Sequence, residues 1–214
     1  MVLPILSIMR TANLISIFGY GSLTDIQSAR STLPSAENFR KGRLEGYRRS
    51  YNLVSIGGIK SGSANLKTLE MAALSIHPSD SDSKVLGCLF DVDRSDLEPY
   101  KEREHRYNIV QVMVHEENGH IVNAYTVVQQ TDEEYKQTMS ESEYYERVGQ
   151  YYSGSVWGRT DILPMRDYMK QVNAAQRVLG GQEYVDNMLE DTLLADGVTT
   201  LKQYLQSCSE ISRL

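Results

Sequence analysis

The 214-residue sequence contains only two cysteines, Cys88 and Cys208. Cys88 lies in an apolar run and Cys208 in a polar stretch near the C-terminus, which is not the spacing of a disulfide framework. Disulfides belong mainly to oxidising compartments, whereas cytosolic proteins keep their thiols reduced. We therefore expect a cytoplasmic protein, and a chain of this length can bury a hydrophobic core without disulfides or metals.

Long apolar runs and an excess of basic residues are also missing. No run approaches the ~20 apolar residues of a membrane-spanning helix, and the apolar segment 2–9 is short, lacks a basic start and is interrupted by Pro4, unlike a secretory signal peptide. Lys and Arg number 22 against 28 Asp and Glu, for a net charge of −6. Because nucleic-acid-binding surfaces are normally basic, we expect neither nucleic acid nor membrane as a partner.

The motifs of several common chemistries are absent as well. The histidines show no HxH or HExxH grouping, so we expect no metal site. The sequence has no Walker-type glycine-lysine loop and no G-x-S-x-G elbow. Its G-Y-G-S stretch at 19–22 lacks the third glycine and the long following helix of a dinucleotide-binding fold.

The most distinctive stretch that is present is Ile15–Leu23, with the sequence ISIFGYGSL. It begins as an apolar, β-prone run and ends in Gly19 and Gly21, followed by Ser22. Glycines let the chain turn tightly and let a ligand approach the backbone, and the N–H groups of such a turn can hold a carboxylate or phosphate. The same pattern also fits an ordinary loop after an edge strand, because glycine pairs are common in turns.

Hydrophobic patterning predicts a strand-dominated region up to about residue 130 and helices beyond it. Residues 57–63 are rich in glycine and serine and predict a flexible loop. Asn118-Gly119 predicts a hairpin turn. The expected strands begin at Ile15 and continue with 41–54 (a pair of strands), 71–77, 85–92, 108–115 and 121–129.

Helix starts are predicted by capping-box sequences at Ser95–Glu98 and Thr131–Glu134, and Thr200 is expected to cap a last short helix. Pro164 is expected at the start of a longer helix that ends at the glycine pair 180–181. The apolar stripe of that helix is expected to pack in the core rather than to hold a cofactor; it comprises Met165, Tyr168, Met169, Val172, Ala175 and Leu179.

Two charged clusters have more than one interpretation. Lys41, Arg43, Arg48 and Arg49 form the one basic cluster of the chain; such residues usually solvate a strand edge, but they could also attract an anionic small molecule. The run 101–107 has the sequence KEREHRY.

Glu102 and Glu104 within that run cannot share a helix face, so one of them is expected to turn inward. The run is either a solvated helix terminus or the source of a general base, with Glu104 entering a pocket beside the first strand.

Four blocks of the sequence together resemble the γ-glutamylcyclotransferase superfamily, which includes glutathione-degrading ChaC-type enzymes and AIG2-like proteins. The blocks are FGYGSL at 18–23, GYRRSYN at 46–52, LGCLF at 86–90 and REHRY at 103–107. The resemblance implies an α+β fold with a barrel-like twisted sheet and short helices over residues 1–130. Residues 131–214 lie outside it, and we expect them to form a helical extension packed on the same domain.

The resemblance also implies a site. Its glycine turn would bind the γ-glutamyl group through Gly19, Tyr20, Gly21, Ser22 and Leu23. Glu104 would be the acid/base, Tyr107 matches the aromatic residue that follows it, and Tyr125 matches a tyrosine near the pocket. The histidine-arginine-glycine and proline-glycine blocks of ChaC-type enzymes are missing, and His105 stands where many relatives have a small residue.

The implied reaction is release of 5-oxoproline from a small γ-glutamyl compound. The α-amino group of the substrate is the nucleophile, so no cofactor is required. A non-catalytic γ-glutamyl-binding module is the alternative. In either case the C-terminal helices could form an interaction surface, and the protein is expected to be a monomer or a homodimer.

Overall fold

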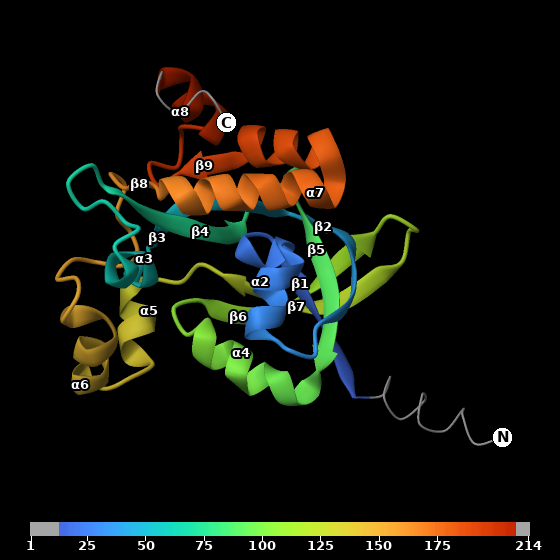
Figure 1. The fold of residues 1–214 in the computed structure, drawn as a ribbon, viewed down its shortest axis with the longest axis horizontal. Coiled ribbons are helices and arrows are strands. Elements are labelled where there is room, and N and C mark those ends of the chain that lie inside the picture. The colour runs from blue at the N-terminus through green and yellow to red at the C-terminus, as the bar shows by residue number, and fades with distance from the viewer. Residues whose placement is uncertain (1–12, 209–214) are drawn as a thin grey trace.

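The computed structural model describes residues 13–208 and contains two β-sheets (Figure 1). Five strands form a closed barrel in the order β1-β5-β2-β6-β7, and four strands form a second sheet in the order β8-β4-β3-β9. The barrel strands are β1 (Leu14–Gly19), β2 (Glu37–Glu45), β5 (Lys84–Asp93), β6 (Asn108–Glu116) and β7 (Ile121–Val128). The second sheet contains β3 (Tyr47–Val54), β4 (Glu70–Pro78), β8 (Leu163–Pro164) and β9 (Thr192–Leu194).

The barrel closes around β1. On one side β1 pairs antiparallel with β5, from Leu14 opposite Asp93 to Gly19 opposite Cys88, and on the other it pairs parallel with β7. The apolar run of β5 is buried, as its continuous hydrophobicity predicts for a central strand. β6 and β7 form the predicted hairpin, whose Gly119 has a positive φ of 85°.

The pair of strands expected at 41–54 exists, but its two members lie in different sheets. β2 pairs with β5 and β6 in the barrel, whereas β3 pairs with β4 and β9. Between them Gly46 has a φ of 72°, a left-handed conformation that redirects the chain from one sheet to the other. β2 and β3 are therefore neighbours in sequence and not hydrogen-bonded partners.

The α-helices flank both sheets, and Figure 1 shows α7 running along the second sheet. They are α2 (Ile26–Thr32), α3 (Ile56–Ser61), α4 (Leu97–Arg103), α5 (Asp132–Gln137), α6 (Glu141–Tyr144), α7 (Arg166–Glu190) and α8 (Leu201–Ser207). Shorter turns are the 3₁₀ helices η1 (Ser22–Thr24) and η2 (Arg94–Asp96) and the π-helical η3 (Tyr145–Gly149). In the described part of the chain, no helix combines the length and apolar character needed to cross a membrane.

Two of the predicted helix caps are confirmed. Thr131 and Thr200 each form a complete capping box, with the residue three positions on reaching back to the cap backbone. The box expected at Ser95 does not form, because a 3₁₀ turn precedes α4 and Asp96 becomes the capping residue without a side-chain bond.

Two other local predictions are wrong. Residues 57–63 are not a flexible loop, because Ser55 accepts a hydrogen bond from Gly58 N–H and starts α3. Pro164 does not begin a helix, since it pairs with Ala72 as part of β8 and α7 begins at Arg166. The helix expected to end at the glycine pair 180–181 continues to Glu190 as α7, with an interruption at Gly181, whose φ is 67°.

The segment after residue 130 does more than add helices. Its strands β8 and β9 extend the second sheet on both edges, each in parallel pairing. Met169, Val172 and Met188 of α7 are buried in the same hydrophobic cluster as Tyr51 and Leu74 of that sheet. The C-terminal segment therefore shares its core with the rest of the chain.

Candidate functional site

A cavity lies where β1 ends, between the barrel, α4 and α7. The residues that line it come from segments far apart in the sequence: Phe18, Gly19, Tyr20, Gly21, Ser22, Leu23, Leu74, Tyr100, Glu104, Tyr107, Val127 and Tyr168. The list includes every residue of the predicted glycine turn together with Glu104 and Tyr107. The tertiary structure thus brings together two sequence blocks about 80 residues apart.

The glycine turn is packed closely enough that both of its glycines are needed. A Cβ on Gly19 would lie 2.7 Å from the Cβ of Leu23, and one on Gly21 would lie 2.8 Å from the hydroxyl oxygen of Tyr168. Neither distance is compatible with a side chain unless neighbouring atoms shift. The turn is therefore closely packed against its neighbours and is not a loose loop after an edge strand.

Hydrogen bonds fix the turn through its carbonyl oxygens. The N–H and the side-chain hydroxyl of Thr24 donate to the carbonyl of Gly21, at 3.0 and 2.6 Å, and Asp25 N–H donates to the carbonyl of Ser22. These bonds engage the carbonyl oxygens of the turn and not the N–H groups of Gly21 and Leu23. Backbone N–H groups in such a turn can bind an anion.

Glu104 enters the cavity at the end of α4. Its N–H donates to the carbonyl of Tyr100 and its own carbonyl accepts from Tyr107 N–H, so the backbone is held on both sides. Burial raises the pKa of the Glu104 carboxyl, and the positive charges of Arg103 and Arg106 oppose part of that rise. Arg103 lies 3.2 Å from Oε1 of Glu104.

Glu102, two residues earlier, has the opposite environment. Its side chain is 69% exposed and forms an ion pair with Arg147 at 2.8 Å, whereas the side chain of Glu104 is 13% exposed. The prediction that one of the two glutamates turns inward is therefore confirmed, and the inward residue is Glu104.

Four tyrosines line the same cavity as Glu104: Tyr20, Tyr100, Tyr107 and Tyr168. Burial raises the pKa of each phenol, to about 12 for Tyr168, and the negative charge of Glu104 adds to the effect. Hydrogen bonds from the backbone of Ser22 and Leu74 oppose part of the rise at Tyr168. All four phenols therefore stay protonated at neutral pH and can donate hydrogen bonds.

Two of these hydroxyls are unsatisfied. Tyr107 donates to the carbonyl of Leu74 at 2.8 Å, but within residues 13–208 the buried hydroxyls of Tyr20 and Tyr100 have no hydrogen-bond partner. Buried polar groups are nearly always hydrogen-bonded, since leaving one unpaired costs free energy. Unpaired donors beside a carboxyl and an anion-binding turn are suited to a polar ligand.

Sequence reasoning missed Tyr100, Tyr168 and Leu74 as members of the site. Tyr168 was interpreted as part of the apolar stripe of α7, and it does contact Tyr51 of the core edge to face. Its hydroxyl reaches the turn only because α7 packs against the second sheet. The one available signal was a hydroxyl within an otherwise apolar stripe.

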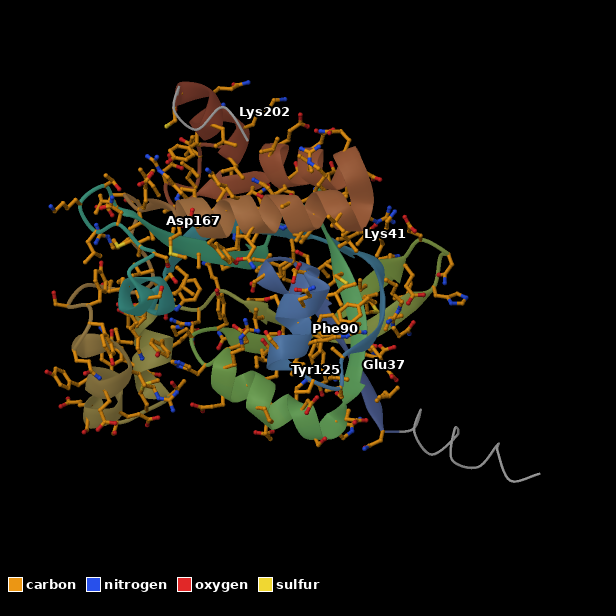
Figure 2. All side chains as sticks on the ribbon, in the orientation of Figure 1. Glu37, Lys41, Phe90, Tyr125, Asp167 and Lys202 are labelled. Atoms are coloured by element: carbon orange, nitrogen blue, oxygen red, sulfur yellow. The ribbon has the colours of Figure 1, made fainter. Side chains whose placement is uncertain are left out.

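Tyr125 and His105 do not enter the cavity. Tyr125 lies on β7 and is the register partner of Ile17 on the neighbouring strand β1, whereas Phe90 is the partner of Ile17 on β5; Figure 2 labels both aromatic residues. Nδ1 of His105 lies 3.0 Å from the hydroxyl of Tyr135, outside the cavity lining. Burial, with the nearby charges of Arg106 and Arg147, lowers the pKa of His105 to about 4.

The basic cluster is divided by the fold. Lys41 and Arg43 pair with Glu117 and Glu45 at the surface, as expected of a solvated strand edge. Arg49 is buried, and its Nε donates to the carbonyl of Tyr20 at 3.3 Å. Within the described residues, no three His, Cys, Asp or Glu side chains are grouped so that they could hold a metal ion.

The barrel, the adjoining sheet and the glycine turn beside a buried glutamate define a γ-glutamylcyclotransferase-like fold. This confirms the α+β, barrel-like class predicted from the sequence. No protein-family model matches the chain, and no curated protein matches it.

Solved structures do match. A protein described as gamma-glutamyl cyclotransferase has a TM-score of 0.57 and 16% identity, over 94% of this chain and 99% of that chain. A human protein described as uncharacterized, loc79017, has a TM-score of 0.56 and 18% identity, over 81% and 85%. A yeast gamma-glutamyl cyclotransferase described as specific to glutathione has a TM-score of 0.52 and 11% identity, over 82% and 95%. At these identities the similarity is one of fold.

Proposed function

We propose that this protein is a γ-glutamylcyclotransferase, which releases 5-oxoproline from a small γ-glutamyl compound. The observation that carries the proposal is the position of Glu104. Its buried carboxyl, with a raised pKa, shares one cavity with the turn Gly19–Leu23 and with two unpaired tyrosine hydroxyls. The names of structural neighbours with the same fold support the same class of reaction.

The turn and the carboxylate have complementary tasks in this reaction. The N–H groups of Gly21 and Leu23 hold the α-carboxylate of the substrate, while the chain of the γ-glutamyl group folds back on itself. This pose brings the α-nitrogen next to the γ-carbonyl carbon, and prior orientation of reacting atoms removes much of the entropic barrier.

Glu104 moves the proton. Its carboxylate takes a proton from the α-ammonium group, and the freed nitrogen attacks the γ-carbonyl carbon. The resulting oxyanion is stabilised by hydrogen bonds from neighbouring donors, among which the hydroxyls of Tyr20 and Tyr100 are unpaired. The bond from the γ-carbon to the leaving nitrogen then breaks as Glu104 gives its proton to that nitrogen. The ring nitrogen loses its second proton, which passes by way of Glu104 to the departing amine, so 5-oxoproline and an ammonium compound are formed.

The test is an assay for 5-oxoproline with glutathione, several γ-glutamyl amino acids and γ-glutamyl-ε-lysine as substrates. The name of the yeast neighbour makes glutathione the first compound to try. Release of 5-oxoproline from at least one of them is expected. Binding of these compounds without any release would instead identify a non-catalytic γ-glutamyl-binding module.

Glu104→Gln and Glu102→Gln form a matched pair for the role of the carboxylate. Both changes remove one negative charge at the same end of α4, but only Glu104 lines the cavity. We expect Glu104→Gln to lower kcat by ~10²–10⁴-fold, the usual contribution of general acid–base catalysis, and Glu102→Gln to stay within about twofold of the unchanged protein. Equal activity of the two variants would exclude Glu104 as the acid/base.

A further inference from the structure

Among residues 13–208, Arg49 is a buried cation without a direct ionic partner. The residue is 1% exposed, and its guanidinium donates to three uncharged acceptors: the carbonyl of Tyr20, the carbonyl of Leu86 and Oδ1 of Asn187. Burial lowers the pKa of Arg49 to about 10, so the group still carries its charge at neutral pH. Burying a charge without an ion pair is costly.

The first of these acceptors belongs to the glycine turn. The carbonyl oxygen of Tyr20 accepts from Nε of Arg49 and from Nε2 of Gln176, both at 3.3 Å. Because a trans peptide is planar, its N–H points away from its carbonyl oxygen. Two buried donors on the Tyr20 carbonyl therefore direct the N–H of Gly21 away from Arg49 and Gln176, and Gly21 lines the cavity.

A positive charge on a carbonyl also polarises the whole peptide group. Hydrogen bonds in a chain strengthen one another, and inside a protein the low dielectric enlarges the effect. The N–H of Gly21 becomes a stronger donor, and the charge itself attracts an anion on the far side of the peptide. Gln176 orients the same carbonyl but contributes no charge.

On the side away from the turn, the hydrogen bonds of Arg49 lead through Asn187 to a carboxylate. Asn187 accepts from Nη1 of Arg49 at 2.8 Å, and its Nδ2 donates to Oδ2 of Asp191 at 2.6 Å. Asp191 therefore neutralises part of the Arg49 charge from a distance, through an amide. Any change at Asp191 should alter the potential that reaches the turn without altering a residue of the cavity.

We propose that Arg49 is a positioning residue that orients and polarises the Tyr20–Gly21 peptide to bind the α-carboxylate of a γ-glutamyl compound or of 5-oxoproline. This inference rests on the proposed function for the identity of the anion. It assigns the selectivity for a carboxylate over a neutral group to Arg49, tuned by Asp191 through Asn187.

The test compares the Kd of 5-oxoproline with that of its uncharged amide, measured by calorimetry for each variant. The Kd of the amide divided by the Kd of the acid reports carboxylate selectivity, and its measurement does not require turnover. We expect Arg49→Gln, which keeps a neutral donor, to lower the ratio about tenfold, since bonds to charged groups are stronger than neutral ones. Arg49→Lys should lower the ratio by a smaller factor because it keeps the positive charge.

Two further variants separate charge from orientation. Gln176→Met removes a neutral donor from the same carbonyl and should lower the ratio by less than about threefold, because the charge remains. Asp191→Asn keeps an acceptor oxygen for Asn187 but removes the opposing charge, so carboxylate selectivity should rise about two- to threefold. Asp191 lies away from the core, so Asp191→Asn tests the proposed role of Arg49 even where Arg49→Gln does not fold.

The inference is overturned when the unchanged protein shows no preference for the acid, or when the ratio is the same in Arg49→Gln and Asp191→Asn as in the unchanged protein. Release of 5-oxoproline by the unchanged protein is measured separately. Turnover with unaltered ratios would reject the role of Arg49 and keep the enzyme, whereas altered ratios without turnover would reject the enzyme and keep the role of Arg49.

Discussion

At the scale of single residues, the environment of Glu104 links stability to function. Burial raises the pKa of its carboxyl above the ordinary value of 4.5, so the native state holds the proton more tightly than the unfolded chain. The ionised form is therefore disfavoured in the folded protein, and it contributes a cost at every pH above the raised pKa. A carboxyl in that state is a better base than an exposed one.

The first prediction concerns stability. Glu104→Gln should raise the melting temperature at pH 7, because it removes a buried ionised group. The gain should shrink as the pH falls through the raised pKa and vanish below the ordinary pKa, where Glu104 is neutral in both states. Thermal unfolding from pH 3 to pH 8 measures this change in melting temperature, with Glu102→Gln as the control. An equal increase at all pH values would contradict the raised pKa.

The second prediction concerns the acid limb of the pH–rate profile. Arg103 lowers the pKa of Glu104 and lies 3.2 Å from its carboxylate. Replacing it in Arg103→Gln should move the acid limb of kcat/KM to higher pH, because a larger share of Glu104 is then protonated. Lys101→Gln removes a charge from the same helix, where Lys101 pairs with Glu98 instead. An identical shift in both variants would show a general charge effect.

The third prediction tests the close packing of the glycine turn. Gly21→Ala places a Cβ 2.8 Å from the Tyr168 hydroxyl and should lower the free energy of unfolding by ~1–3 kcal/mol, as overpacking does. Tyr168→Phe removes that oxygen, so it should recover part of the loss in the double variant. A double-mutant cycle from urea unfolding measures the coupling, and simple additivity of the two changes would contradict the contact.

At the scale of secondary-structure elements, α7 connects the core to the site. Its buried face packs in the core through Met169 and Val172, and the same element supplies Tyr168 to the cavity and Gln176 to the turn. After its interruption at Gly181, the element supplies Asn187 to Arg49. The position of α7 therefore affects the geometry of the turn in two ways: directly through Gln176, and indirectly through Asn187 and Arg49.

The fourth prediction concerns that interruption. Gly181 has φ 67° and ψ −147°, a region that is nearly restricted to glycine. Gly181→Ala should cost ~1–3 kcal/mol in the free energy of unfolding. Val178→Ala is the control on the same helix, since Val178 is 89% exposed. Chemical denaturation of both variants measures the difference, and equal stability would contradict the requirement for glycine.

At the scale of the whole molecule, the second sheet depends on the segment after residue 130. β8 and β9 occupy the two edges of the second sheet, next to β4 and β3, and the buried residues of α7 belong to the common core. The expected domain boundary near residue 130 and the expected monomer or homodimer stay predictions. So does the cytoplasmic location expected from the cysteine content.

The fifth prediction follows from this shared core. A chain ending at residue 130 should fail to fold and should aggregate, because it exposes Tyr51, Leu74 and the edges of the second sheet. Size-exclusion chromatography and circular dichroism of the shortened and full chains provide the measurement. A monomeric, folded product would show that residues 1–130 form an independent domain.

Much of the local structure was predictable from the sequence, because the signals that determine it are local. Strand positions follow from hydrophobic runs and alternation, and the helix caps at Thr131 and Thr200 depend on residues three positions apart. The two failures have different causes. At 57–63 the local cap, in which Ser55 accepts from Gly58 N–H, outweighs the glycine-rich composition, whereas Pro164 is drawn into an edge strand by pairing with β4.

The sequence by itself determined a barrel-like α+β fold and a glycine turn with anion-binding potential. It also determined that one of the two glutamates Glu102 and Glu104 turns inward. Only the tertiary structure decided which side chains complete the site. Tyr100, Tyr168 and Arg49 are separated in sequence from the turn by about 30 to 150 residues, and no local pattern encodes where their polar atoms point. Those positions follow from how α7 and the second sheet pack against the barrel, since close packing admits few arrangements of buried side chains.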